Sequence, residues 1–228
     1  MIEASMKVRS SAVAPQANVP DRITPVIELA KGKKVLNIGC CGSDALTSVK
    51  TVHRRIAEVA SRCVGIDIYE DGIKKMQADG EEVYLANAES FDINIKDFDL
   101  VVLGDIIEHV SNPGLVLDNA NRHLHDEGIL FVTTPNPFSI AMFLKILVRG
   151  GYNVNSEHVT WFDPVLLSFL LDRSGFKSAQ LLWTGPSKHS ILRFLLSFRS
   201  DLRADFGIVG KKFRSIATKT NETRIEII

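Results

Sequence analysis

The order of apolar and helical segments between residues 33 and 133 constrains the fold of this chain more than any other feature. Short apolar runs alternate there with stretches of helical periodicity. The apolar runs cover residues 35–38, 63–68, 82–86, 98–103 and 128–133. The helical stretches cover residues 53–61, 71–78 and 114–123. Because this alternation is typical of βαβ units, it predicts an α/β protein built on a parallel sheet.

The pattern changes after Pro135. Residues 138–148 are apolar and helix-like, and a polar break with two glycines follows at residues 150–156. Neither segment continues the alternation of strands and helices. We therefore interpret residues 136–162 as an insertion over the functional edge of the sheet.

The last part of the chain completes the sheet. Asp163 and Pro164 are typical of a helix start, and the leucine-rich helix that they begin ends at Gly175. Strand-like runs follow at residues 177–183 and 206–209. The whole pattern predicts a Rossmann-like, seven-stranded doubly wound sheet, mostly parallel, with a C-terminal antiparallel hairpin formed by the last two strands.

The 228 residues suit one domain with additions to it. We expect these segments: a flexible arm at 1–20, the domain at 21–215 with insertions at 136–162 and 186–204, the latter helical, and a tail at 216–228.

Charge and composition narrow the choice of partner. The chain has 27 basic and 27 acidic residues, so no net charge attracts nucleic acid or an anionic membrane. No apolar run approaches the roughly 20 residues that span a bilayer. Cys40, Cys41 and Cys63 suit reduced thiols better than a disulfide framework. We expect a cytoplasmic protein that acts on a small molecule, and the sequence leaves a homo-oligomer open.

A glycine turn follows the first apolar run of the alternating pattern. Asn37, Gly39, Cys40 and Gly42 end that predicted strand, and glycines let the backbone turn sharply and approach a ligand. The alternative is a tight turn that binds nothing. Asp67 ends the next predicted strand, where an acid accepts hydrogen bonds from ribose hydroxyls in such folds. The two features together favour a nucleotide-like ligand.

These and later motifs resemble the class I S-adenosylmethionine-dependent methyltransferases, particularly the branch of quinone-biosynthesis and other small-molecule enzymes, over residues 33–183. The matching segments are residues 37–42, 67–68, 87–89, 98–105, 124–136 and 157–176. The resemblance implies S-adenosylmethionine as cofactor. It implies these cofactor-binding residues: Asn37, Gly39, Cys40, Gly42, Asp67, Ile68, Asn87, Ala88, Glu89, Gly104 and Asp105. Asn37 replaces the family's acid, and Cys41 and Ser43 replace common glycines, so the methionine end is expected to be held differently.

His109 and His158 are the candidate catalytic residues. Methyl transfer to a hydroxyl needs a group that removes the proton, and an imidazole suits that task at neutral pH. Asp105, Glu108 and His109 would share one face of a helical turn and, joined by His158, resemble the ligands of some metal-dependent methyltransferases. We favour the alternative interpretation, in which this turn shapes the pocket without binding an ion. No metal is therefore expected.

The function expected is methyl transfer from S-adenosylmethionine to an oxygen or nitrogen atom of a small molecule. Two alternatives stay open at this point. A nucleotide-dependent oxidoreductase would use the same glycine turn, although the chain lacks a full G-x-G-x-x-G. A non-catalytic cofactor-binding module would account for the departures at Asn37, Cys41 and Ser43.

Overall fold

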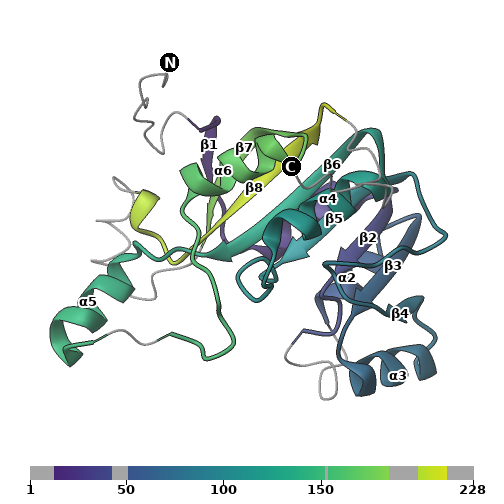
Figure 1. The fold of residues 1–228 in the computed structure, drawn as a ribbon, viewed down its shortest axis with the longest axis horizontal. Helices are drawn as coiled ribbons and strands as arrows, with labels where there is room; N and C mark the ends of the chain where they lie inside the picture. Colours follow the sequence, from purple (N-terminus) through teal and green to yellow (C-terminus); the bar gives the residue numbers. More distant parts are fainter. Residues whose placement is uncertain (1–12, 43–50, 152–153, 185–199, 215–228) are drawn as a thin grey trace, which may run out of the picture.

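A computed structural model of the chain describes residues 13–42, 51–151, 154–184 and 200–214. There the strands form one eight-stranded sheet in the order β1-β7-β8-β6-β5-β2-β3-β4 (Figure 1). The strands are β1 (Gln16–Asn18), β2 (Lys34–Ile38), β3 (Arg62–Asp67), β4 (Val83–Leu85), β5 (Phe98–Gly104), β6 (Leu124–Pro135), β7 (Phe176–Thr184) and β8 (Asp205–Lys212). The helices are α1 (Ile23–Ala30), α2 (Val52–Ala57), α3 (Glu70–Ala78), α4 (Pro113–His123), α5 (Ile140–Arg149), α6 (Pro164–Arg173) and the short η2 (Ser200–Leu202).

The sheet is mostly parallel, as the alternating pattern predicts. β4, β3, β2, β5 and β6 run in one direction. β8 lies between β6 and β7 and is antiparallel to both. The expected C-terminal hairpin is therefore confirmed. The strand order reverses between β2 and β5, and this switch point is where doubly wound sheets bind ligands.

The N-terminal segment differs from the arm expected at residues 1–20. β1 pairs in parallel with β7 and makes the sheet eight-stranded rather than seven-stranded. The indole of Trp183 donates a hydrogen bond to the Gln16 side chain at 2.9 Å. A strand of three residues is too short to show a sequence period, which explains why the pattern misses it.

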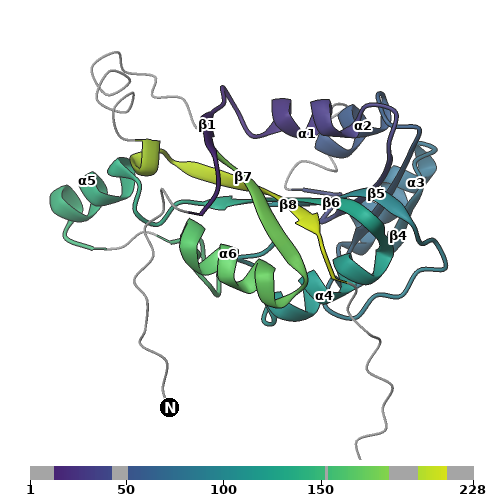
Figure 2. The ribbon, with the colours of Figure 1, turned by 90° about the horizontal axis from the view of Figure 1, so that it is seen from above.

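Helices cover both faces of the sheet, α1 and α2 on one and α4 and α6 on the other (Figure 2), and an apolar layer lies beneath each pair. Alternate residues of a strand point to opposite faces, so neighbours on β5 enter different layers. Leu100 and Val102 pack with α1 and α2, whereas Val101 and Leu103 pack with α4 and α6. This double burial explains why the strands are continuously apolar in sequence.

Helix α6 begins where the sequence predicts, and α5 lies within two residues of the apolar segment expected at 138–148. Asp163 caps α6 by accepting hydrogen bonds from the backbone of Val165 and Leu166. Ser139 caps α5, and Gly150 ends it with a left-handed φ of 71°. In the part of the chain that the structure describes, no helix is both long and apolar enough to cross a bilayer.

Several expected segments lie outside the described residues. They are residues 1–12 of the arm, Ser43 of the glycine turn, most of the helical insertion at 186–204, and the tail at 216–228. Of that insertion, only residues 200–204 are described, and they include η2.

Candidate functional site

Four neighbouring parallel strands end at the same edge of the sheet and gather most of the predicted cofactor residues there. The paired ends are close in register: Ile38 lies opposite Ile66 and Leu103, and Asp67 lies opposite Leu85. Gly39, Asp67, Asn87 and Gly104 follow or end these strands. Residues that are distant in the sequence therefore border one site at the switch point.

The glycine turn after β2 is held tightly to β3. Gly39 has a left-handed φ of 79°, which favours glycine. The backbone N–H groups of Gly39 and Cys40 both donate to the carbonyl of Ile66, at 2.9 and 3.1 Å. Across the switch point, Gly104 is exposed, and a methyl group added to it would meet no atom of the described residues within 4 Å. The site therefore has open space at Gly104.

Asp67 is fixed at the end of β3 by two backbone N–H groups. Cys41 donates to Oδ2 at 2.9 Å and Tyr69 donates to Oδ1 at 3.0 Å. Each carboxylate oxygen keeps further capacity to accept hydrogen bonds. The next side chain, Ile68, is 73% exposed. The edge therefore presents a fixed acid beside a free apolar surface.

Asn37 and Cys40 are buried rather than open to this edge. The Asn37 side-chain amide lies 3.3 Å from His53 Nδ1. Burial, and then the charge of Arg54, lower the pKa of His53 to about 4. Asn37 thus contacts a neutral histidine beneath the site in this structure, so a direct role in cofactor binding stays a prediction.

The segment after β4 forms a tight turn. Asn87 is exposed, and its side chain accepts a hydrogen bond from the backbone of Glu89 at 2.8 Å. The Ala88 carbonyl accepts from Asn119 of α4 at 3.0 Å, and the Glu89 carboxylate accepts from the Ser111 backbone at 2.9 Å. α4 and the loop before it therefore hold this turn beside Asp67.

Asp105 makes two contacts that sequence reasoning missed. It has a left-handed φ of 52°, unusual for a residue with a side chain. The Thr133 hydroxyl donates to its Oδ1 at 2.8 Å, and the Arg22 guanidinium donates to its Oδ2. Arg22 is 83 residues away in the chain, so no local pattern could have indicated the pair.

The turn after β5 meets the insertion at a cluster of three side chains, Glu108, His109 and His158. One ligand atom from each lies within 4.8 Å of those of the other two. The two imidazole rings stand edge to face with centroids 4.6 Å apart. The Glu108 backbone carbonyl accepts from Val159 and Thr160, at 2.9 and 3.3 Å, which ties the insertion to this turn.

The pKa values of Glu108 and His158 are shifted by their surroundings. Burial raises the pKa of Glu108 to about 7. Its Oε2 accepts from the Thr134 hydroxyl at 3.0 Å, while its buried Oε1 has no hydrogen-bond partner among the described residues. Burial, and then the neighbouring His109, lower the pKa of His158. His158 is therefore able to accept a proton at neutral pH.

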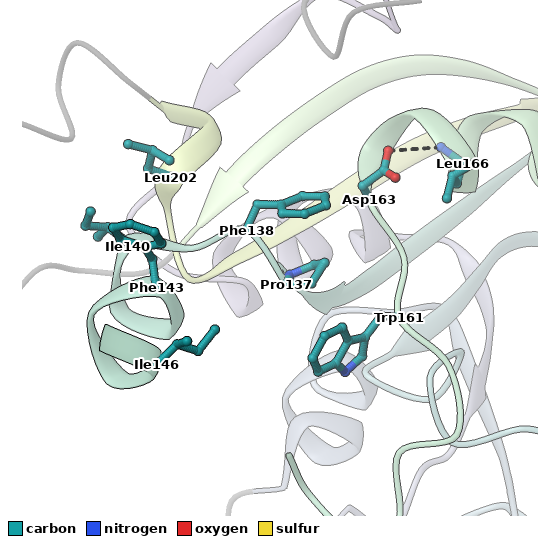
Figure 3. A pocket seen from close by; sticks show the side chains of 9 residues that line it. All are labelled: Pro137, Phe138, Ile140, Phe143, Ile146, Trp161, Asp163, Leu166 and Leu202. Carbon is teal, nitrogen blue, oxygen red and sulfur yellow. Dashed lines mark hydrogen bonds between the residues drawn. The ribbon is translucent and has the colours of Figure 1, made fainter. Parts of the chain in front are cut away.

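An apolar groove adjoins this cluster. It has a volume of about 690 Å³ and lies between α5 and the start of α6 (Figure 3). Phe138, Phe143 and Trp161 are among its lining residues. A smaller hollow of about 90 Å³ shares Pro137 and Trp161 with the groove and is also lined by His158. An imidazole therefore lines a hollow that lies next to the large apolar groove.

Known proteins are similar to most of the chain. A family model described as a methyltransferase domain matches residues 15–181. The ubiquinone biosynthesis O-methyltransferase of Glaesserella parasuis is 27% identical over 156 residues, which cover 57% of this chain and 63% of that enzyme. Its counterpart from Azorhizobium caulinodans is 25% identical over 166 residues, 66% of this chain and 61% of that enzyme. The chain thus spans less than two thirds of these relatives.

Solved structures share the fold at lower identity. A methyltransferase from Archaeoglobus fulgidus that depends on S-adenosylmethionine is 20% identical, with a TM-score of 0.62 over 84% of this chain and 91% of that one. The N-methyltransferase NodS from Bradyrhizobium japonicum, in complex with S-adenosylhomocysteine, is 16% identical, with a TM-score of 0.54 over 85% and 86%.

Proposed function

The chain belongs to the S-adenosylmethionine-dependent methyltransferases, and on that premise we propose that it methylates an oxygen or nitrogen atom of a small molecule with an apolar body. Membership of this family bears on the two alternative functions that the sequence left open. The family points to S-adenosylmethionine as the cofactor, and it favours an enzyme of this class over a nucleotide-dependent oxidoreductase or a non-catalytic module.

The residues at the sheet edge fit this cofactor. The carboxylate of Asp67 has the acceptor capacity that a ribose diol needs, and the exposed Ile68 offers an apolar surface to an adenine ring. The space at Gly104 and the glycine turn at Gly39 leave the backbone open to the methionine end. Arg22 and Thr133 would position Asp105 beside it.

The acceptor proposal rests on one observation, the two lining residues, Pro137 and Trp161, that the two hollows share. The large groove is lined mainly by apolar side chains, and the neighbouring small hollow, which shares Trp161 with it, is lined by His158. An apolar body in the groove would bring a polar group toward the imidazole. The insertion at residues 136–162, with α5 in it, would act as the wall of the acceptor site.

His158 is the candidate base. The cofactor supplies a methyl group activated on a sulfonium, so the chain has to align the acceptor and remove its proton. The lowered pKa keeps His158 neutral at pH 7 and ready to accept that proton. His109, whose ring stands 4.6 Å away, would orient His158. The Glu108 carbonyl holds the segment that follows His158 in place.

A panel of acceptors tests the proposal. Transfer of a labelled methyl group would be measured to phenols and catechols with and without an alkyl chain, and to aromatic amines of matched size. We expect kcat/KM to rise with the alkyl chain and transfer to fall in His158→Gln. Preference for charged acceptors without an apolar body would refute the role of the groove.

The unpartnered Glu108 Oε1 favours a second candidate in which a divalent cation takes part. One carboxylate and two imidazoles within 4.8 Å suit such an ion, and Glu108, His109 and His158 would hold it. The ion would lower the pKa of an acceptor hydroxyl. Activity that survives chelation, in protein shown by metal analysis to be metal-free, would exclude this candidate in favour of the histidine base.

A further inference from the structure

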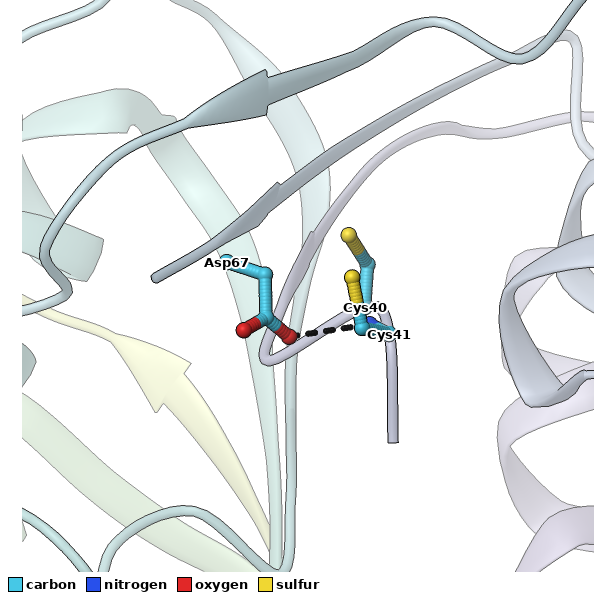
Figure 4. Close-up of side chains that lie close together, drawn as sticks. All are labelled: Cys40, Cys41 and Asp67. Carbon is cyan, nitrogen blue, oxygen red and sulfur yellow. Dashed lines mark hydrogen bonds between the residues drawn. The ribbon is translucent and has the colours of Figure 1, made fainter. Parts of the chain in front are cut away.

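The cofactor edge contains a second cluster of potential ligands, formed by two neighbouring cysteines. Cys40 and Cys41 are free thiols, 3% and 2% exposed. Their sulfur atoms and a carboxylate oxygen of Asp67 all lie within 4.8 Å of one another. Figure 4 shows both thiols beside the carboxylate, with the hydrogen bond from the Cys41 backbone to Asp67. Three ligand atoms therefore converge at the end of β2 and β3.

Two glycines leave the space that the sulfur atoms occupy. A Cβ atom on Gly65 would lie 2.7 Å from Cys40 Sγ, and one on Gly72 would lie 2.8 Å from Cys41 Sγ. Such distances are too short for any real contact, so a larger residue at either position would displace a thiol. The backbone of β3 and α3 thus accommodates both side chains on the same side of the turn.

We propose that Cys40, Cys41 and Asp67 bind a thiophilic d10 cation of the class of Cd²⁺ and Zn²⁺ through two sulfur atoms and one carboxylate oxygen. Two atoms that are each about 2.3 Å from a central ion lie at most roughly 4.6 Å apart. The ligand atoms, within 4.8 Å of one another, therefore need to move little to enclose the ion.

Binding displaces two protons. Cys40 and Cys41 are free thiols, and a thiol binds a metal ion as its thiolate. The cation replaces the two thiol protons, forms two metal–sulfur bonds and releases both protons to water. No electron is transferred. Affinity should therefore increase with pH.

Asp67 belongs both to this metal site and to the cofactor site. The second assignment rests on the proposed function. A carboxylate oxygen bound to a cation is no longer available to ribose hydroxyls in the same way, so the ion and the cofactor should weaken each other. By thermodynamic linkage the two effects must be equal in size. The structure thus assigns to this edge an inhibitory site for thiophilic metals.

Cys63 provides a matched control. It is the third free cysteine, its sulfur lies 3.7 Å from His53 Nδ1, and burial raises the pKa of its thiol to about 12. It is not a member of the cluster of Cys40, Cys41 and Asp67. Replacing Cys63 removes one thiol and should leave the proposed site intact.

The test is a titration of the reduced, metal-free protein with Cd²⁺, followed by the ultraviolet charge-transfer absorption of thiolate bound to cadmium. An ion bound by Glu108, His109 and His158 has no thiolate ligand, so it does not contribute to this absorption. We expect one tight ion in the wild-type protein and in Cys63→Ser, loss of the signal in Cys41→Ser, and about tenfold or greater weakening in Asp67→Asn. Circular dichroism would check that each variant is folded.

The outcomes separate the metal site from the cofactor site. A signal unchanged in Cys41→Ser, or lost in Cys63→Ser, would overturn the proposed ligands. Saturating S-adenosylhomocysteine should weaken Cd²⁺ binding by about tenfold or more, and its failure to do so while bound would overturn the sharing of Asp67. S-adenosylhomocysteine that does not bind the metal-free protein at all would instead contradict the proposed cofactor site, whatever the cadmium signal.

Discussion

The two halves of the site are built in different ways. The cofactor half comes from the ends of β2, β3 and β5, with Asp67 fixed by two backbone N–H groups above a buried layer. The acceptor half comes from α5 and residues 154–163, where Phe143 is 55% exposed. In the proposed function the invariant cofactor meets strand ends that backbone hydrogen bonds hold, while the acceptor would meet an insertion whose side chains contribute little to the core.

This contrast predicts that changes in the acceptor half alter turnover without altering stability. His158→Gln should lower kcat by about 10²–10⁴-fold, because the variant cannot accept the acceptor proton. Steady-state kinetics measures the loss. Calorimetry with S-adenosylhomocysteine and thermal unfolding should give wild-type values. In the wild-type enzyme the rate should rise with pH through the lowered pKa of His158. A kcat within about threefold of wild type would contradict the role of His158 as base.

Beneath the cofactor half, His53 should make stability depend on pH. Folded His53 has a pKa of about 4, against an ordinary value of 6.5, because burial and then the positive charge of Arg54 disfavour its protonated form. The unfolded chain therefore binds the proton first as the pH falls. Stability is fully present above pH 6.5 and declines by about 3 kcal/mol toward pH 4.

Urea unfolding at pH 7 and pH 4.5 measures this decline. His53→Gln should lose less stability than the wild-type protein over the same interval. His125→Gln, at a histidine whose side chain is 38% exposed, is the control and should behave as wild type. Equal declines in all three proteins would rule out His53 as the cause.

Two glycines at the cofactor half should respond in opposite ways. Gly65→Ala places a methyl group against Cys40 and His53 and should cost about 1–3 kcal/mol of stability. Gly104→Ala meets no described atom within 4 Å and should change stability by less than about 0.5 kcal/mol. The Gly104→Ala variant should instead bind the cofactor more weakly, because the added methyl group enters the open space of the site. Thermal unfolding and calorimetry on both variants check this, and similar unfolding temperatures would contradict it.

The smallest effect is expected on α5. Phe143→Ser removes an apolar wall of the groove but should change stability by less than about 0.5 kcal/mol. The KM for an acceptor with an alkyl chain should rise by about threefold to tenfold, or roughly 1 kcal/mol. Val148→Ser, on the same helix but away from the groove lining, is the control. Equal KM values in both variants would argue against the groove.

The sequence predicts the ends of β2 and β3 well because the signals for them are local. A glycine after an apolar run, or an acid at the end of the next, needs only neighbouring residues to be recognised, and Gly39 and Asp67 lie where those signals put them. The sequence pattern already groups His158 with the turn of Glu108 and His109, and in the structure the centroids of the two imidazole rings lie 4.6 Å apart.

The features that the sequence did not predict depend on contacts between segments that are distant in the chain. Arg22 meets Asp105 only after α1 docks on the sheet, and nothing within α1 indicates it. β1 has three residues and gains its place from β7. The burial of Asn37 against His53 was also missed, because an amide at the end of a strand gives no sign of the face that it takes.

The pairing of β1 with β7 has a consequence for the order of folding. The strand that contains Gln16 can pair only after Trp183, 167 residues later in the chain, has been synthesised. At a ribosomal rate of about 5–20 residues per second, that delay is roughly 10–30 s. The segment made earliest in the sheet is therefore among the last to join it, and a nascent chain halted before β7 would leave that strand without its neighbour.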